Sequence, residues 1–325
     1  KGEYTLEGDN FTLTAELLDI ETGERILGKK YSGKKSELRL SAHKFSDELV
    51  HQLFGEKGIA QTRIAYVSKR TGAKEIMVMD YDGAGVQEVT KNKTINLAPC
   101  WLDGKSKVLY TSYANQQPQF FVKDFETGKN GLYYKSTGMN TAGSYNRTDK
   151  EIVYSSSTEG NPEIYRRAHP DGGKATRLTF SGAIDVSPSW SPNGYEIVFV
   201  SDRSGKPMLY VMDRDGSNLR RITYEGEYFG SPSWSPKGDR IAYTGMDEGN
   251  NMNIFTLTPD GKDIQKLTTG SGSNENPSWS PDGRKLVFMS TRTGSAEIWM
   301  MDADGRNPRR ISHSGQNSMP RWSDY

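Results

Sequence analysis

Hydrophobic and polar positions in this chain alternate within many short segments, as they do in half-buried β-strands. A four-residue apolar or alternating segment recurs as V-L-Y-T from Val108, I-V-Y-S from Ile152, I-V-F-V from Ile197, I-A-Y-T from Ile241 and L-V-F-M from Leu286. An aromatic residue stands seven positions before each segment and appears once more near the end of the sequence. These aromatics are Trp101, Tyr145, Trp190, Trp234, Trp279 and Trp322, spaced 43 to 45 residues apart. The pattern indicates an internal repeat.

Each repeat continues with a third strand, a glycine-containing turn and a fourth strand, as in E-I-W-M-M-D, A-D-G and R-R-I-S. Four strands in about 44 residues is the size of one β-propeller blade. Two repeats depart from the W-S-P-D-G pattern, one with Trp101-Leu-Asp-Gly and one with Tyr145-Asn-Arg-Thr-Asp. Both keep the seven-residue spacing, so we expect both blades to form.

The two ends of the array are unequal. The first unit, from Ile64, has strands two to four but no aromatic opening strand, and the last opening strand, M-P-R-W-S-D-Y, has nothing after it. We therefore expect residues 317–325 to complete blade one and to close a six-bladed propeller over residues 58–325. Closure removes sheet edges that would invite aggregation. An open array of the same repeats, the alternative, would need capping repeats.

Residues 1–57 do not read as such a cap. They hold two alternating strands, F-T-L-T-A-E-L-L and R-I-L-G-K-K-Y, and a predicted helix from about Ser36 or Ser41 to Gly55. Leu38, Phe45, Leu49 and Leu53 share one face of that helix. The fold class is thus mainly β, a propeller preceded by part of a small α/β domain.

Charge, hydropathy and cysteine content argue against several classes of protein function. The chain has 42 Lys and Arg against 41 Asp and Glu, so no basic excess favours nucleic acid. No apolar run approaches the roughly 20 residues that cross a bilayer, so we expect no direct membrane insertion. The single cysteine, Cys100, excludes an intramolecular disulfide and a cysteine-rich zinc site, and a small buried hydrophobe is its expected role.

Strand direction divides the loops between two faces of the disc. The turns after strands one and three repeat S-P-x-G and D-x-D-G motifs, which tight turns require, and we call their side the turn face. The other side, the mouth, carries the variable 2–3 loops and 4–1 connections around the central channel. Apolar side chains expected to be exposed there are Leu97, Met139, Val186, Tyr228, Phe229 and Met319. Apolar and amide groups around a concave mouth favour a protein or peptide ligand.

A catalytic site is not indicated. The chain lacks G-x-S-x-G, and its four histidines are scattered without metal-ligand spacing. We expect no enzyme activity and no cofactor. The alternatives left open are a hydrolase or lyase with its site in the channel, a glycan-binding propeller using Tyr228 and Phe229, and a channel calcium ion near Asp185 and Glu275.

The repeat sequences W-S-P-D-G, I-V-F-V-S-D-R-S-G, Y-V-M-D-R-D-G and R-R-I-T resemble the TolB propeller family of the Gram-negative Tol–Pal system. The flank F-G-x-K-G-I-A-x-T-R-I-A-Y-V, residues 54–67, is similar to the junction between the two domains of that family. The resemblance implies a periplasmic scaffold that binds the Pal lipoprotein at the propeller mouth and contributes to outer-membrane integrity and cell division. It also implies colicin-type peptides in the channel, and TolA binding by the N-terminal domain if that domain is complete.

Alignment of the repeats places the family's partner-binding loops on residues 139–142, 185–187, 228–231, 273–276 and 317–319. Together with the strand-direction argument, this assigns the candidate partner-binding residues. They are Asn96, Leu97, Met139, Asn140, Thr141, Ala142, Asp185, Val186, Ser187, Tyr228, Phe229, Ser231, Asn274, Glu275, Asn317 and Met319.

Overall fold

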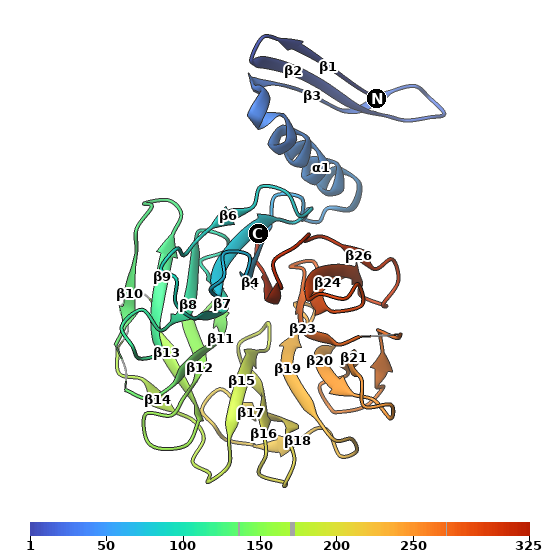
Figure 1. The fold of residues 1–325 in the computed structure, drawn as a ribbon. Coiled ribbons are helices and arrows are strands. Elements are labelled where there is room, and N and C mark those ends of the chain that lie inside the picture. Colours follow the sequence, from blue (N-terminus) through green and yellow to red (C-terminus); the bar gives the residue numbers. More distant parts are fainter. Residues whose placement is uncertain (136, 170–172, 271) are drawn as a thin grey trace.

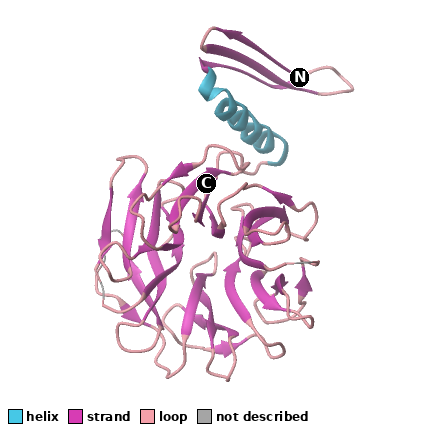
Figure 2. Ribbon diagram, in the orientation of Figure 1, coloured by secondary structure: helices cyan, strands magenta, loops and turns pink. Residues whose placement is uncertain are grey.

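The structure is a computed structural model that describes residues 1–135, 137–169, 173–270 and 272–325. Six four-stranded antiparallel sheets follow one another around a central channel, and a three-stranded sheet with one helix stands beside this disc (Figures 1 and 2). The six-bladed propeller predicted from the repeat is confirmed.

Five blades each use four consecutive strands, with the first strand innermost. Blade two comprises β7 (Asn96–Leu102), β8 (Lys107–Ser112), β9 (Gln119–Asp124) and β10 (Asn130–Tyr134). Blade three comprises β11 (Asn140–Asn146), β12 (Glu151–Ser156), β13 (Glu163–Ala168) and β14 (Thr176–Arg177). Blade four comprises β15 (Asp185–Trp190), β16 (Glu196–Ser201), β17 (Met208–Asp213) and β18 (Arg220–Arg221).

Blade five comprises β19 (Phe229–Trp234), β20 (Ile241–Met246), β21 (Met252–Leu257) and β22 (Gln265–Lys266). Blade six comprises β23 (Asn274–Trp279), β24 (Lys285–Ser290), β25 (Glu297–Asp302) and β26 (Arg309–Arg310). The two blades without the full W-S-P-D-G pattern, two and three, form as expected. In blade three, Asn146 Oδ1 accepts the Thr148 N–H at 3.0 Å and closes the turn in place of the serine used elsewhere.

Blade one is assembled from both ends of the propeller. It contains β4 (Arg63–Ser68), β5 (Glu75–Asp80), β6 (Gln87–Glu88) and, as its inner strand, β27 (Ser318–Trp322). In the antiparallel pairing of β27 with β4, Trp322 lies opposite Ile64. The indole Nε1 of Trp322 donates to Thr62 Oγ1 at 2.8 Å, and the ring is buried between blades one and six. The C-terminal strand therefore closes the ring as predicted.

The N-terminal part contains β1 (Gly2–Glu7), β2 (Asn10–Leu18), β3 (Arg25–Lys34), a short 3₁₀ turn η1 (Lys35–Glu37) and α1 (Leu38–Phe54). The predicted helix is confirmed, and Gly55 ends it in the left-handed conformation with φ 69°. One difference appears, since β1 was not predicted; Leu53, on the predicted apolar face of the helix, is 52 % exposed. Neither described helix is long and apolar enough to cross a membrane.

Helix α1 lies beside the first blade (Figure 1), and polar contacts join the two on the turn face. Arg39 Nη1 lies 3.0 Å from Asp82 Oδ2, and His43 Nε2 lies 3.2 Å from the same oxygen. Asp47 Oδ1 accepts the Ala60 N–H at 2.7 Å. The helix thus adjoins the side of the disc opposite the mouth.

The propeller core lies between the blades, where the second and third strands of each sheet are mostly buried. Leu209, Val211, Ile197 and Phe199 are inaccessible to solvent in one such cluster. Cys100 is also buried, as expected, and burial raises the pKa of its thiol to about 12. A thiol in this environment stays protonated at neutral pH.

Candidate functional site

On the mouth face, each inner strand begins at a buried residue or, in β27, directly after one. Five of these six residues are Asn or Asp, and the sixth is Phe. Their exposed fractions run from 0 to 6 %, and they are Asn96, Asn140, Asp185, Phe229, Asn274 and Asn317. The expectation that Phe229 is exposed is wrong: it is 6 % exposed and packs on Tyr243, with ring centroids 5.4 Å apart.

These buried residues take part in a repeated contact between neighbouring blades. Beside blade one, the Thr90 hydroxyl donates to Glu75 Oε2 and accepts the Ile76 N–H at 2.9 Å. Asn96, which begins the inner strand of blade two, donates to the same Glu75 oxygen at 3.0 Å. We call this unit a blade clasp: a third-strand side chain, a Thr or Ser after the fourth strand, and the residue at the start of the next inner strand or directly before it.

The blade clasp recurs with different chemistry around the ring. Glu297, Ser312 and Asn317 form one, and Asn253, Thr268 and Asn274 form another. These clasps explain Asn96, Asn274 and Asn317 as structural residues, whereas Asn140 instead donates to the Pro118 carbonyl at 3.1 Å and accepts from Ser156 at 2.7 Å. Buried amides and carboxylates require hydrogen-bond partners, and the clasp supplies them.

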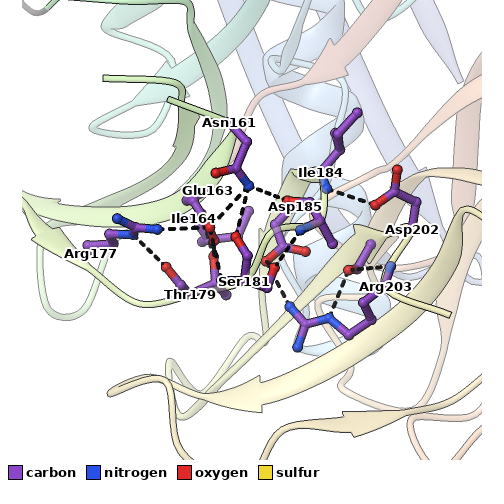
Figure 3. A network of polar contacts seen from close by, with 12 residues as sticks. Asn161, Glu163, Ile164, Arg177, Thr179, Ser181, Ile184, Asp185, Asp202 and Arg203 are labelled. Carbon is purple, nitrogen blue, oxygen red and sulfur yellow. Dashed lines mark hydrogen bonds and ion pairs between the residues drawn. The ribbon is translucent and has the colours of Figure 1, made fainter. Parts of the chain in front are cut away.

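One clasp carries two acids. Its members are Glu163, Thr179 and Asp185, with Asp185 in the place of the usual asparagine (Figure 3). Asp185 is fully buried, and its Oδ2 accepts from Arg203 Nη2 at 2.8 Å. Its Oδ1 has no hydrogen-bond partner within the described residues. Burial raises the pKa of Asp185, although the Arg203 guanidinium opposes that rise.

One clasp is largely apolar. Met208, Thr223 and Phe229 take the three positions, and Gly245 stands opposite Phe229 where β12, β16 and β24 carry a serine. The Thr223 hydroxyl still accepts the Leu209 N–H at 2.9 Å. Apolar residues replace polar ones at these positions, so the mouth is more apolar between blades four and five than at the other clasps.

A pocket of about 190 Å³ opens beside the apolar clasp. It brings together five candidate residues, which are Val186, Ser187, Tyr228, Phe229 and Ser231. A sixth, Gly230, lies within the predicted loop 228–231, and four further lining residues were not predicted, namely Ile184, Val200, Asp202 and Pro207. The signal that could have revealed the pocket is the Phe in a series of Asn and Asp at the same repeat position.

Tyr228 stands at the rim of this pocket, 37 % exposed. Burial raises its pKa, and the negative charge of Glu275 in the next blade raises it further. Glu275 is itself half-buried, and its pKa is also raised by burial. The structure thus brings Tyr228 and Glu275 into one electrostatic neighbourhood.

The other candidate residues lie around the rest of the mouth. Met139 is 54 % exposed, and Thr141 is half-buried. Leu97 and Met319 are half-buried and pack against one core cluster between blades one and two, so they are less available than expected. The side chain of Ala142 lies outside the described part of the structure.

The positions named for a channel cation offer poor coordination. The charged partner of Asp185 is Arg203, a cation already in place, and Glu275 belongs to another blade. No group of three or more His, Cys, Asp or Glu side chains suited to a metal occurs among the described residues. A channel calcium ion stays an untested prediction, and no role is derived from it.

Comparisons with known proteins agree with this architecture. A family model described as the TolB beta propeller domain matches residues 50–325. A TolB homolog from Chlorobium luteolum is 40 % identical over 323 residues, covering 99 % of this chain and 73 % of that protein. A Tol-Pal system protein TolB from Desulfosudis oleivorans is 37 % identical over 164 residues, 50 % of this chain and 37 % of that protein.

A solved structure shows the same arrangement over the full chain. The crystal structure of TolB from Acinetobacter baumannii superposes with a TM-score of 0.87 at 26 % identity, covering all of this chain and 82 % of that one. TolB is a non-enzymatic component, which agrees with the expectation that the chain is not an enzyme. This chain therefore belongs to the TolB β-propeller family of the Tol–Pal system.

Proposed function

We propose that the propeller mouth binds a protein partner, the Pal lipoprotein or a Pal-like domain, and that the protein is a periplasmic scaffold of the cell envelope. The Desulfosudis relative is named as a protein of the Tol–Pal system. Through this partner the chain would contribute to outer-membrane integrity and cell division. TolA contact through the N-terminal part and capture of colicin-type peptides belong to the same proposal.

The observation that carries the proposal is the apolar pocket between blades four and five, with exposed apolar side chains beside it. Ile184 is 48 % exposed and Tyr228 37 % exposed at its edge. Energetic hot spots of protein interfaces are aromatic or aliphatic anchors in well-packed pockets, surrounded by polar groups that exclude water. Asp202 and Ser231 supply polar groups at this site.

Calorimetric titration with the Pal periplasmic domain tests the proposal. We expect saturable heat with the wild-type protein and at least tenfold weaker binding for Tyr228→Ala, because truncating an interface anchor costs 2 kcal/mol or more, at about 1.4 kcal/mol per factor of ten. Met139→Glu should weaken binding as well, since it places a charge on an exposed apolar site.

Tyr195→Ala is the matched control. Tyr195 is also an exposed tyrosine, at 66 %, but it stands in the turn between β15 and β16 on the turn face. Its loss should leave affinity within twofold of wild type. Absence of heat with folded wild-type protein, or equal effects of the two tyrosine variants, would contradict binding at the mouth.

A further inference from the structure

The turn face of the channel holds a second cavity, larger than the mouth pocket. Its volume is about 460 Å³, within the roughly 300–1,000 Å³ typical of small-ligand sites. Turn residues such as Pro192, Pro236 and Pro281 form its outer wall, and residues of the inner strands form its inner wall. Five of the six tryptophans of the chain also line it, Trp101, Trp190, Trp234, Trp279 and Trp322.

One repeat position inside this cavity changes character in blade one. The residue before the conserved aromatic is Cys100 in blade two and a serine in blades three to six, but in the closing strand β27 it is Arg321. An arginine thus enters a position that otherwise holds small side chains. Nothing in the closure of the ring requires it, because the strand pairs through its backbone.

The guanidinium of Arg321 is a charge without a protein partner. No hydrogen bond or ion pair of this group occurs with any described residue, and its backbone oxygen alone is engaged, by Trp101 Nε1 at 2.9 Å. The other charged residues of the cavity wall, Arg147 and Asp324, pair with each other at 3.0 Å. Arg321 therefore leaves the cavity with one uncompensated positive charge.

Arg321 is half-buried, and this partial burial makes its unpaired charge costly. Desolvation lowers the pKa of Arg321, with only the weak opposing effect of the neighbouring Cys100. Arginine nevertheless stays protonated in proteins, so its charge persists. A buried charge is costly unless it is paired and hydrogen-bonded, and an anion in the cavity would supply the missing partner.

Hydroxyl groups that line the same cavity as Arg321 can add donors. Ser144, Ser189 and Ser278 accept the backbone N–H of Trp190, Trp234 and Trp322, at 2.7, 3.2 and 3.0 Å. Each serine therefore acts as an acceptor there, and no acceptor for its own O–H occurs among the described residues. The wall of the cavity thus carries one guanidinium and several hydroxyl donors, a combination suited to oxyanions.

We propose that this cavity is an oxyanion site in which Arg321 binds a phosphate-type anion or a peptide carboxylate. The guanidinium fork matches the two oxygens of either group. The site lies on the face opposite the proposed partner-binding mouth, so anion binding can be tested independently of Pal binding.

Tryptophan fluorescence provides a direct test because most indoles of the chain line the cavity. Titration with inorganic phosphate at constant ionic strength should give a saturable change and raise the unfolding temperature. A parallel titration uses a short neutral peptide with a free C-terminal carboxylate, with its amidated form as control. Saturation by phosphate alone assigns a free anion, and saturation by the carboxylate but not the amide assigns a peptide end.

Arg321→Ser tests the assigned residue with little risk to folding, since serine is the residue of four other blades. We expect binding to weaken at least tenfold and the thermal shift to disappear. Arg147→Ser removes a cation from the rim and should change affinity less than twofold. The proposal is overturned by a wild type that saturates with neither probe, by unchanged binding in Arg321→Ser, or by equal losses in both variants.

Discussion

The acidic and apolar blade clasps allow one threonine to be compared with another inside the same fold. Thr179 and Thr223 are 4 and 2 % exposed and occupy equivalent positions after the fourth strands of blades three and four. Each hydroxyl accepts one buried backbone N–H, from Ile164 and Leu209, both at 2.9 Å. Replacing either with the isosteric valine removes that acceptor.

The two hydroxyls donate to different acceptors. Thr179 donates to Oε2 of Glu163, an oxygen with no other donor among the described residues, whereas Thr223 donates only to the Met208 sulfur at 3.7 Å. An orphaned buried N–H costs about 1–3 kcal/mol, and a hydrogen bond to a charged group contributes about 1.5–3 kcal/mol. Thr179→Val should therefore reduce the free energy of unfolding by about 1.5–3 kcal/mol more than Thr223→Val.

Urea unfolding followed by circular dichroism measures both variants, with an unchanged dependence on urea as the check that the unfolding transition is the same. Thr179→Ser, which keeps the hydroxyl and loses a methyl group, should cost only about 1 kcal/mol. Equal costs of the two valine variants, or a larger cost at Thr223, would refute the view that the clasp carboxylate strengthens the contact between blades.

Three further outcomes follow from the structure. Trp322→Ala should lower the free energy of unfolding by about 3–5 kcal/mol, because the ring is buried in the closing seam; urea unfolding showing less than about 1 kcal/mol would speak against that seam. Burial raises the pKa of Asp185, so the native state keeps this proton to a higher pH than the unfolded chain does, and wild-type stability should fall as pH rises from the ordinary value of 3.8 through the folded pKa. The Asp185→Asn variant should lack that decline when urea midpoints are measured across this pH range. Parallel pH profiles for the wild type and the variant would contradict the assignment to Asp185. Cys100, with its pKa raised to about 12, should resist a thiol reagent near neutral pH until urea unfolds the protein, and rapid labelling of the native state would disagree.

Most of the architecture could be predicted from the repeat, because strand periodicity and turn residues act locally. Alternation predicted the four strands of each blade, and the mismatch of the two array ends predicted the pairing of β27 with β4. The first strand, β1, escaped notice because only Tyr4 and Leu6 alternate in it, and all six of its residues are exposed in the structure. Leu53 shares the predicted helix face and is 52 % exposed, because helical spacing does not show how far the packing partner extends.

The mouth was harder to predict, since local pattern does not show which side of an inner strand is covered. Phe229 and Asp185 stand at the same repeat position as the clasp asparagines, and both are buried, Phe229 against Tyr243 and Asp185 beside Arg203. Carboxylates are almost never fully buried without a partner, and Arg203 supplies one for Asp185 only after the fold is formed. Exposure was predicted correctly at Met139 and Tyr228, which are 54 and 37 % exposed.

The pairing of β27 with β4 has a consequence for the order of events during folding. Five blades can assemble from contiguous stretches, but the bond from the Arg63 N–H to Ser323 Oγ joins residues 260 positions apart. Bringing such distant segments together carries the largest loop-closure entropy in the ring, so this seam should form last. A force that separates the two ends of the propeller would break the pairing of β27 with β4 first and open the disc at that seam.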